Sequence, residues 1–289
     1  MIGRKRGAAI LVHALFLFFA SSPSEAASPA ARPPQARRAV APDVAAYQAA
    51  AAALLAKMGT PDSGATLPGI TDPAYVRFRE QATALAEVLG TEKFPVHVPD
   101  VDTICGPANK VSVAYMLDGA GDLYRQVRSE PQKMPQALAA LMQQNGAKYF
   151  EQMLPIHLFL LRCTAASLPA ARVFVAGLAP EEMTAVRVNG LRQVQAGITQ
   201  SFAGMLDVAF APALDARRRI GVLQAVAADG PRMVPSLPRE VRPRMRAVLD
   251  RLRLAQKGES RKLADAIAVQ LESDACDVIC NAGVLVPPR

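Results

Sequence analysis

The chain has 289 residues, of which 51% are apolar and 5% aromatic, and its 33 Lys and Arg against 25 Asp and Glu give a net charge of +8. A chain of this length suffices for one or two domains. Alanine and leucine favour helices, whereas aromatic and β-branched residues favour strands. The alanine-rich, tryptophan-free composition therefore indicates an all-α protein and argues against a sheet protein.

Residues 1–26 have the order of a secretory signal peptide. The basic triplet Arg4–Arg6 precedes an apolar run at Ala8–Phe19, and Ser24–Ala26 provides small residues for cleavage before Ala27. A membrane-spanning helix needs roughly 20 apolar residues, and this run is much shorter. We therefore expect an exported protein, periplasmic or alternatively extracellular, that is not an integral membrane protein after cleavage.

Residues 27–42 are predicted to form a disordered spacer rich in alanine, proline and arginine. They contain almost no large apolar side chain, so they cannot bury enough surface to offset their conformational entropy. From residue 43 the apolar residues follow a helical period. We expect one helical domain over 43–289, with a sub-boundary near 167–180 as the alternative. Its first two helices are predicted at 43–59 and 71–90, each with a glycine as its stop signal.

Residues 91–107 are expected to form a loop, because three prolines disfavour a regular helix there. The loop contains His97, Asp100 and Asp102, which offer one imidazole nitrogen and two carboxylates to a cation. These three residues are the candidate metal ligands. The alternative is ordinary loop hydrogen bonding and helix capping by short acidic side chains.

The next helices are predicted at about 110–128, 135–145 and 147–166. In the first of them Asp118 and Asp122 share one helix face, with two glycines between them. Paired carboxylates can act as acid and base on a glycosidic bond, which makes both residues candidate catalytic groups. Two alternatives explain the glycines without chemistry: close helix packing, or a helix break after which Asp122 caps a new helix.

The helix at 147–166 is so apolar that we expect a central, buried element. Its His157 is a third candidate catalytic residue, although a histidine at such a position is more often part of the core. A buried imidazole needs a hydrogen-bond partner for each ring nitrogen. Met153 and Leu161, one turn to either side, provide none, so we expect the partner to come from another helix.

The remaining helices are predicted from Pro180 to about Ala209 and at 213–229, 240–257 and 259–281. The whole domain is therefore expected to be a bundle of eight or nine helices.

Positive charge is concentrated in the final third of the chain. Residues 214–262 hold thirteen Lys and Arg but five Asp and Glu, which predicts a positive face. The side chains expected on it are Arg217, Arg218, Arg219, Arg242, Arg246, Arg253, Arg261 and Lys262. The polyanions that an exported protein meets are lipid head groups, polysaccharides and acidic proteins. No aromatic residues are interleaved to stack on bases, so no nucleic acid is expected. The alternative is an ordinary solvated helix surface.

Four cysteines, Cys105, Cys163, Cys276 and Cys280, predict two disulfides in an oxidising compartment. Three pairings are open: Cys105 with Cys163 and Cys276 with Cys280, or either crossed arrangement. Cys276 and Cys280 share a helix face at a Cα separation that a disulfide accepts, although such a bond usually distorts the turn. A redox or zinc site is the weaker alternative, because redox motifs are C-x-x-C and zinc sites need a second clustered pair.

The sequence contains no G-x-S-x-G, H-E-x-x-H, phosphate-loop or dinucleotide-binding pattern, and no cofactor is predicted. An enzyme is therefore the less favoured class. The leading hypothesis is an exported helical protein that acts by binding, as an accessory module, with another envelope protein or an anionic envelope surface as its partner. The alternatives are an envelope hydrolase that uses Asp118 and Asp122 or the His97 loop, and attachment to anionic envelope surfaces through the Arg-rich C-terminal third.

Overall fold

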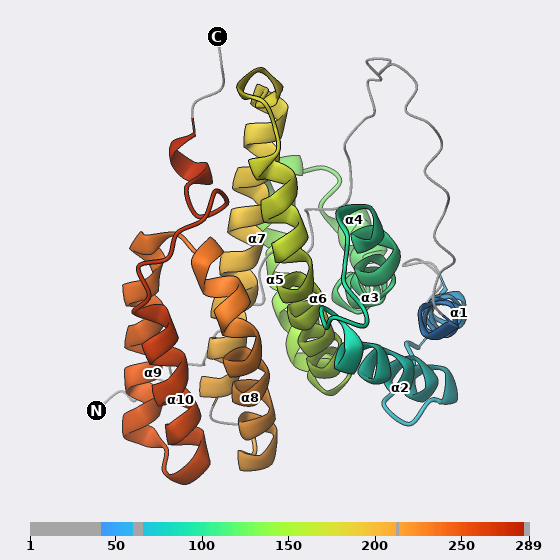
Figure 1. Ribbon diagram of the computed structural model, residues 1–289. Helices are drawn as coiled ribbons and strands as arrows, with labels where there is room; N and C mark the ends of the chain where they lie inside the picture. Colours follow the sequence, from blue (N-terminus) through green and yellow to red (C-terminus); the bar gives the residue numbers. More distant parts are fainter. Residues whose placement is uncertain (1–41, 60–65, 212–213, 286–289) are drawn as a thin grey trace.

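The computed structural model describes residues 42–59, 66–211 and 214–285, which form the all-α bundle that the composition predicts (Figure 1). These residues contain ten α-helices and no strand. The helices are α1 (Pro42–Met58), α2 (Pro73–Val88), α3 (Val101–Met116), α4 (Ala120–Gln126), α5 (Met134–Lys148), α6 (Phe150–Ala176), α7 (Ala185–Phe210), α8 (Ala216–Met233), α9 (Arg242–Ala255) and α10 (Gly258–Leu271). The predicted signal peptide, and residues 27–41 of the predicted spacer, lie outside the described residues.

The predicted helix at 110–128 is broken, which accounts for ten helices where eight or nine were expected. Helix α3 ends at Met116, Gly119 adopts a φ of 78°, and α4 begins at Ala120. Glycine reaches this left-handed conformation without the steric cost that a Cβ atom brings. The helix-break interpretation of the two glycines is therefore confirmed, with Gly119, and not Asp122, as the residue that precedes the new helix.

The predicted loop at 91–107 is shorter than expected, because α3 begins at Val101 and includes Pro107. Proline has no N–H, so the carbonyl of Thr103, four residues earlier, loses its helical donor. Gln48 Nε2 of α1 donates to that carbonyl over 3.0 Å, and the N–H of Ala108 donates to Tyr47 Oη over 2.9 Å. Side chains of a neighbouring helix therefore provide hydrogen bonds where the proline disturbs the helix.

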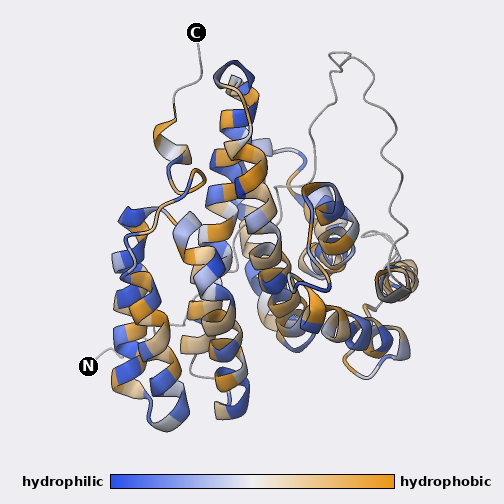
Figure 2. Cartoon of the chain, in the orientation of Figure 1, coloured by the Kyte–Doolittle hydropathy of each residue, from blue (hydrophilic) through white to orange (hydrophobic). Residues whose placement is uncertain are grey.

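Two hydrophobic clusters fill the bundle, and α6 belongs to both. The N-terminal cluster joins α1, α2 and α3 to the α6 residues Ile156 and Phe159, and the C-terminal cluster joins α7, α8, α9 and α10 to Leu161 and Leu168. Figure 1 shows α6 between the two groups of helices, and Figure 2 shows hydrophobic and hydrophilic residues interspersed along them. The expectation of a central, buried helix in this region is confirmed.

Helix α6 has 27 residues and is the one helix in the described parts of the chain that is long and apolar enough to cross a membrane. It extends well beyond the apolar residues that begin at Met153, and it carries Pro155 and Pro169 inside it. The core helix of a folded helical bundle meets the same criteria of length and hydropathy, and residues of the two clusters pack against α6 on both sides. The alternative sub-boundary at 167–180 falls at the end of this helix and the turn after it.

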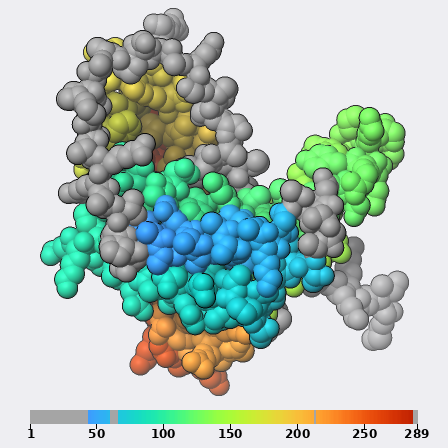
Figure 3. Space-filling model, turned by 90° about the vertical axis from the view of Figure 1, so that its right-hand side faces the viewer, coloured from blue at the N-terminus to red at the C-terminus, as the bar shows by residue number. Residues whose placement is uncertain are grey.

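Helices α1 and α2 form the outer layer of the N-terminal half, where they cover the centre of the face seen in Figure 3. Asp72 caps the start of α2, since its side chain accepts a hydrogen bond from the N–H of Ala74 over 2.9 Å. Tyr75, one turn into the helix, is fully buried and donates to the carbonyl of Gln152 on α6 over 2.7 Å. The Tyr75 hydrogen bond fixes α2 against α6, and α2 forms one wall of the site described next.

Candidate functional site

A groove of about 400 Å³ lies between α2, α6 and α8. We call it the α2–α6–α8 groove. Most of its lining is apolar and comes from Phe78, Ala82, Ala86, Pro155, Ile156, Leu158, Phe159, Ala225 and Ala228. The polar residues that line it are Arg79, Thr83, Glu87, Arg162 and Asp229. The groove lies along α6, where residues of the two hydrophobic clusters meet. Its size and its apolar lining are typical of sites that bind small molecules.

An ion pair lies in the wall of this apolar groove. Arg162 Nη1 of α6 donates to Asp229 Oδ1 of α8 over 2.5 Å, and Arg162 Nε donates to the carbonyl of Ala86 on α2 over 3.3 Å. The Asp229 side chain is 4% exposed and that of Arg162 is 23% exposed. Burial raises the pKa of Asp229, while the guanidinium groups of Arg162 and Arg232 oppose this rise. Arg162 thus connects all three walls of the groove and places a charged group in its lining.

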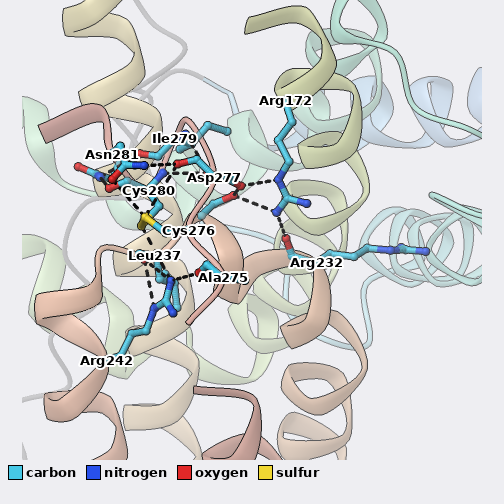
Figure 4. Close-up of polar contacts among 12 residues, drawn as sticks. Arg172, Arg232, Leu237, Arg242, Ala275, Cys276, Asp277, Ile279, Cys280 and Asn281 are labelled. Carbon is cyan, nitrogen blue, oxygen red and sulfur yellow. Dashed lines mark hydrogen bonds and ion pairs between the residues drawn. A yellow bond between two sulfur atoms is a disulfide. The ribbon is translucent and has the colours of Figure 1, made fainter. Parts of the chain in front are cut away.

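The segment after α10, residues 272–285, is the second polar centre of the molecule, and we call it the C-terminal loop. Its Asp277 holds the loop in place (Figure 4). Asp277 Oδ1 accepts hydrogen bonds from the N–H groups of Ile279 and Cys280, over 2.8 and 2.9 Å. Asp277 Oδ2 accepts from Arg172 Nε on α6 and from Ser236 Oγ, each over 2.5 Å. One carboxylate therefore joins the loop both to itself and to the central helix.

Arg242, the first residue of α9, supports the same loop from the other side (Figure 4). It is 4% exposed and donates to the carbonyls of Leu237, Ser273 and Ala275. Its Nη2 also lies 3.9 Å from Cys280 Sγ. Carbonyl oxygens and this sulfur are its hydrogen-bond partners within the described residues, and no carboxylate is among them.

The structure joins Cys105 to Cys163 and Cys276 to Cys280, which is one of the three pairings that the sequence left open. The first disulfide connects α3 to α6 within the N-terminal cluster, and its Cα atoms are 6.0 Å apart. The second closes a short ring in the C-terminal loop, with Cα atoms 5.3 Å apart. The predicted helix at 259–281 ends at Leu271, so Cys276 and Cys280 do not share a helix face.

The candidate metal ligands do not form a site. His97 precedes the short 3-10 turn η1 (Val98–Asp100), and Asp102 lies in the first turn of α3. In the described part of the chain, no group of three or more His, Cys, Asp or Glu side chains could hold a metal ion. The three residues are thus neighbours in the sequence but not ligands around one point.

The candidate pair Asp118 and Asp122 is separated by the helix break at Gly119, so the two residues do not share a helix face. Asp118 Oδ2 accepts hydrogen bonds from Lys148 Nζ over 2.8 Å and from Tyr149 Oη over 2.5 Å. Burial opposes ionisation of Asp118, but these two hydrogen bonds outweigh it and hold its pKa below the usual range. The Asp122 side chain is 71% exposed and pairs with Arg125. Each carboxylate serves a local contact.

His157 finds its partner on another helix, as the sequence predicted. Its Nε2 lies 3.2 Å from Ser112 Oγ of α3, and Ser112 is fully buried. Burial lowers the pKa of His157 to about 4. The imidazole is therefore neutral at physiological pH and takes part in the packing of α3 on α6.

The positive face is smaller than expected, because two of its eight side chains are buried. Arg219 is 8% exposed and donates to the carbonyls of Ala209, Ala211 and Leu214, and Arg242 supports the C-terminal loop. Three others take part in ion pairs: Arg218 with Glu151, Arg246 with Glu272, and Arg253 with Asp250 and Asp265. Arg217, Arg261 and Lys262 are exposed.

The ion pair in the groove was not among the predicted sites. One signal was present, since Arg162 interrupts an apolar helix, and an arginine there indicates a buried partner. Asp229 is 67 residues away in the sequence, and nothing local identifies it as that partner. Comparison of the chain with protein-family models, curated proteins and solved structures found no match.

Proposed function

We propose that the chain is an exported, non-catalytic binding protein whose ligand is a small, largely apolar molecule with one polar group. The observation that carries this proposal is the α2–α6–α8 groove, an apolar site of about 400 Å³ with Arg162 and Asp229 in its wall. Burial of the ligand's apolar surface provides affinity, and the guanidinium and the carboxylate offer a donor and an acceptor to its polar group. Export rests on the residue order of the first 26 positions.

The hydrolase alternative has less support from the geometry. Asp118 and Asp122 are engaged in separate contacts on two helices, and His97, Asp100 and Asp102 do not form a ligand set. Attachment to anionic envelope surfaces is also the weaker alternative, because only part of the predicted positive face is available. Three of its eight members are exposed without an ion pair in the described residues: Arg217, Arg261 and Lys262.

Fluorescence titration with a neutral apolar probe, N-phenyl-1-naphthylamine, tests the proposal on the full chain. We expect a saturable increase in emission with one probe bound per chain. Ala228 of α8 lines the groove and is exposed, so Ala228→Phe should fill the entrance without disturbing the core. We expect this variant to bind the probe at least tenfold more weakly.

The matched control is Ala266→Phe, which adds the same side chain to an exposed position on α10. This variant should bind the probe as the parent chain does. Probe binding that does not saturate, or that both variants weaken equally, would contradict the assignment of the groove as the binding site.

A further inference from the structure

The two disulfides lie in very different surroundings. Cys105 and Cys163 are 7% and 0% exposed and lie inside the N-terminal cluster, between two long helices. In the C-terminal loop, Cys276 is partly exposed, whereas Cys280 is 7% exposed. A thiol from solution therefore reaches one sulfur of the second disulfide, Cys276 Sγ, more easily than any of the other three.

The sulfur that would leave in such an attack has a cation beside it. Arg242 Nη2 lies 3.9 Å from Cys280 Sγ, and three backbone carbonyls hold the guanidinium in place. Burial and the neighbouring Arg239 oppose the charge of Arg242 and lower its pKa. The carboxylates of Asp274, Asp277 and Glu240 favour that charge, but none of them hydrogen-bonds to the guanidinium in the described residues. A thiolate on Cys280 would place an anion in direct contact with the guanidinium. A cation next to a cysteine stabilises the thiolate, and a more stable thiolate leaves faster in disulfide exchange.

We propose that Cys276–Cys280 is a site of reversible thiol–disulfide exchange with low-molecular-weight thiols, in which Cys276 is attacked and Cys280 leaves as a thiolate next to Arg242. The site is independent of the α2–α6–α8 groove and of the ligand proposed for it.

The exchange balances without any further reactant. The thiolate of the attacking compound forms a bond to Cys276 Sγ, and the bond between Cys276 and Cys280 breaks with its electron pair left on Cys280 Sγ. A second thiolate then attacks the outer sulfur of the mixed disulfide and releases Cys276. Two thiols have become one small-molecule disulfide, and the protein disulfide has gained two electrons and two protons as a dithiol.

The loop is built to survive this reduction, which makes the exchange reversible. Asp277 lies between the two cysteines in the sequence, and its carboxylate accepts hydrogen bonds from the N–H groups of Ile279 and Cys280. It also accepts hydrogen bonds from the side chains of Arg172 and Ser236. None of these contacts involves a sulfur atom (Figure 4). The two thiols therefore stay close to one another in the reduced loop, ready to form the disulfide again.

Reduction by glutathione tests the proposal, with Cys105–Cys163 as the internal control. The folded full chain is incubated with reduced glutathione, trapped with N-ethylmaleimide, and digested for mass spectrometry. We expect Cys276–Cys280 to open at least tenfold faster than Cys105–Cys163, with glutathione attached to Cys276. Equal rates for the two disulfides, or glutathione found on Cys280, would overturn the proposal.

The role of Arg242 has a separate test in the Cys276→Ser variant, which leaves Cys280 as a free thiol. Absorbance at 240 nm against pH should give this thiol a pKa at least one unit below the ordinary value of about 8.5, that is, a tenfold higher thiolate fraction in the acid range. Adding Arg242→Lys should preserve most of the shift, whereas Arg242→Met should abolish it. A value of 8.5 or more in the folded Cys276→Ser chain refutes the assignment whether or not the Arg242 variants fold.

Discussion

Replacing Arg219 by methionine should lower the free energy of unfolding by about 3 kcal/mol. The guanidinium donates to the carbonyls of Ala209, Ala211 and Leu214 over 2.9, 3.1 and 2.7 Å, and so caps the end of α7 from inside the structure. A hydrogen bond from a charged donor contributes about 1.5 kcal/mol or more. Three such bonds sum to roughly 4.5 kcal/mol, and a part of this is regained where water reaches the freed carbonyls.

Urea denaturation followed by circular dichroism measures this loss, which should appear as a lower midpoint at an unchanged m value. For a chain of this size, about 3 kcal/mol corresponds to a fall of roughly 6 to 12 °C in Tm. Arg217→Met is the matched control, since Arg217 is exposed and lies two residues away on the same helix. It should change stability by less than about 0.5 kcal/mol. Equal losses of stability in the two variants would refute the capping role, because Arg219 would then behave like an exposed arginine.

Three further predictions concern single side chains. The pKa of His157 is lowered to about 4, so the unfolded chain binds more protons between that pH and about 6.5, and stability should fall as the pH drops through this window. NMR titration of His157 checks the value, and a midpoint near 6.5 would contradict the burial argument. Gly119→Ala should cost about 1 kcal/mol because φ is 78°, whereas Gly190→Ala, inside α7 with open space around a Cβ, should stabilise by about 0.5 kcal/mol. Calorimetry that gives both changes the same sign would count against this explanation. Tyr47→Phe should cost about 1 to 3 kcal/mol, since it leaves the buried N–H of Ala108 without its acceptor; an unchanged urea midpoint would show that the hydrogen bond is dispensable.

Features that depend on local sequence could be predicted. The composition indicated helices throughout, and apolar spacing placed most of them within a few residues. His157 was expected to bond to another helix because its own helix offered nothing, and Ser112 of α3 is that partner. The break at Gly119 was one of two alternatives stated for the glycines, and only the backbone conformation decides between them.

Features that depend on distant contacts could not be predicted. Pro107 suggested a loop, because proline disfavours a regular helix. Nothing near it in the sequence reveals that Gln48 and Tyr47 of another helix provide hydrogen bonds there. Arg219 and Arg242 were assigned to a positive face by the same reasoning, since a sequence shows a charge but not the carbonyls around it. The disulfide pairing was open for a similar reason, because it depends on where the C-terminal loop lies.

The position of α6 in both hydrophobic clusters has a consequence for the order in which the chain assembles. All residues of the N-terminal cluster are present once synthesis has reached Ala176, because every helix that contributes to this cluster ends at or before that residue. The C-terminal helices, in contrast, need a surface that the earlier half supplies, through Leu161 and Leu168. Folding can therefore run from the N-terminus to the C-terminus in step with synthesis, while a fragment that starts at α7 would expose the residues that α6 normally covers. Because the C-terminal cluster needs α6, the C-terminal helices should lose their structure whenever α6 unfolds.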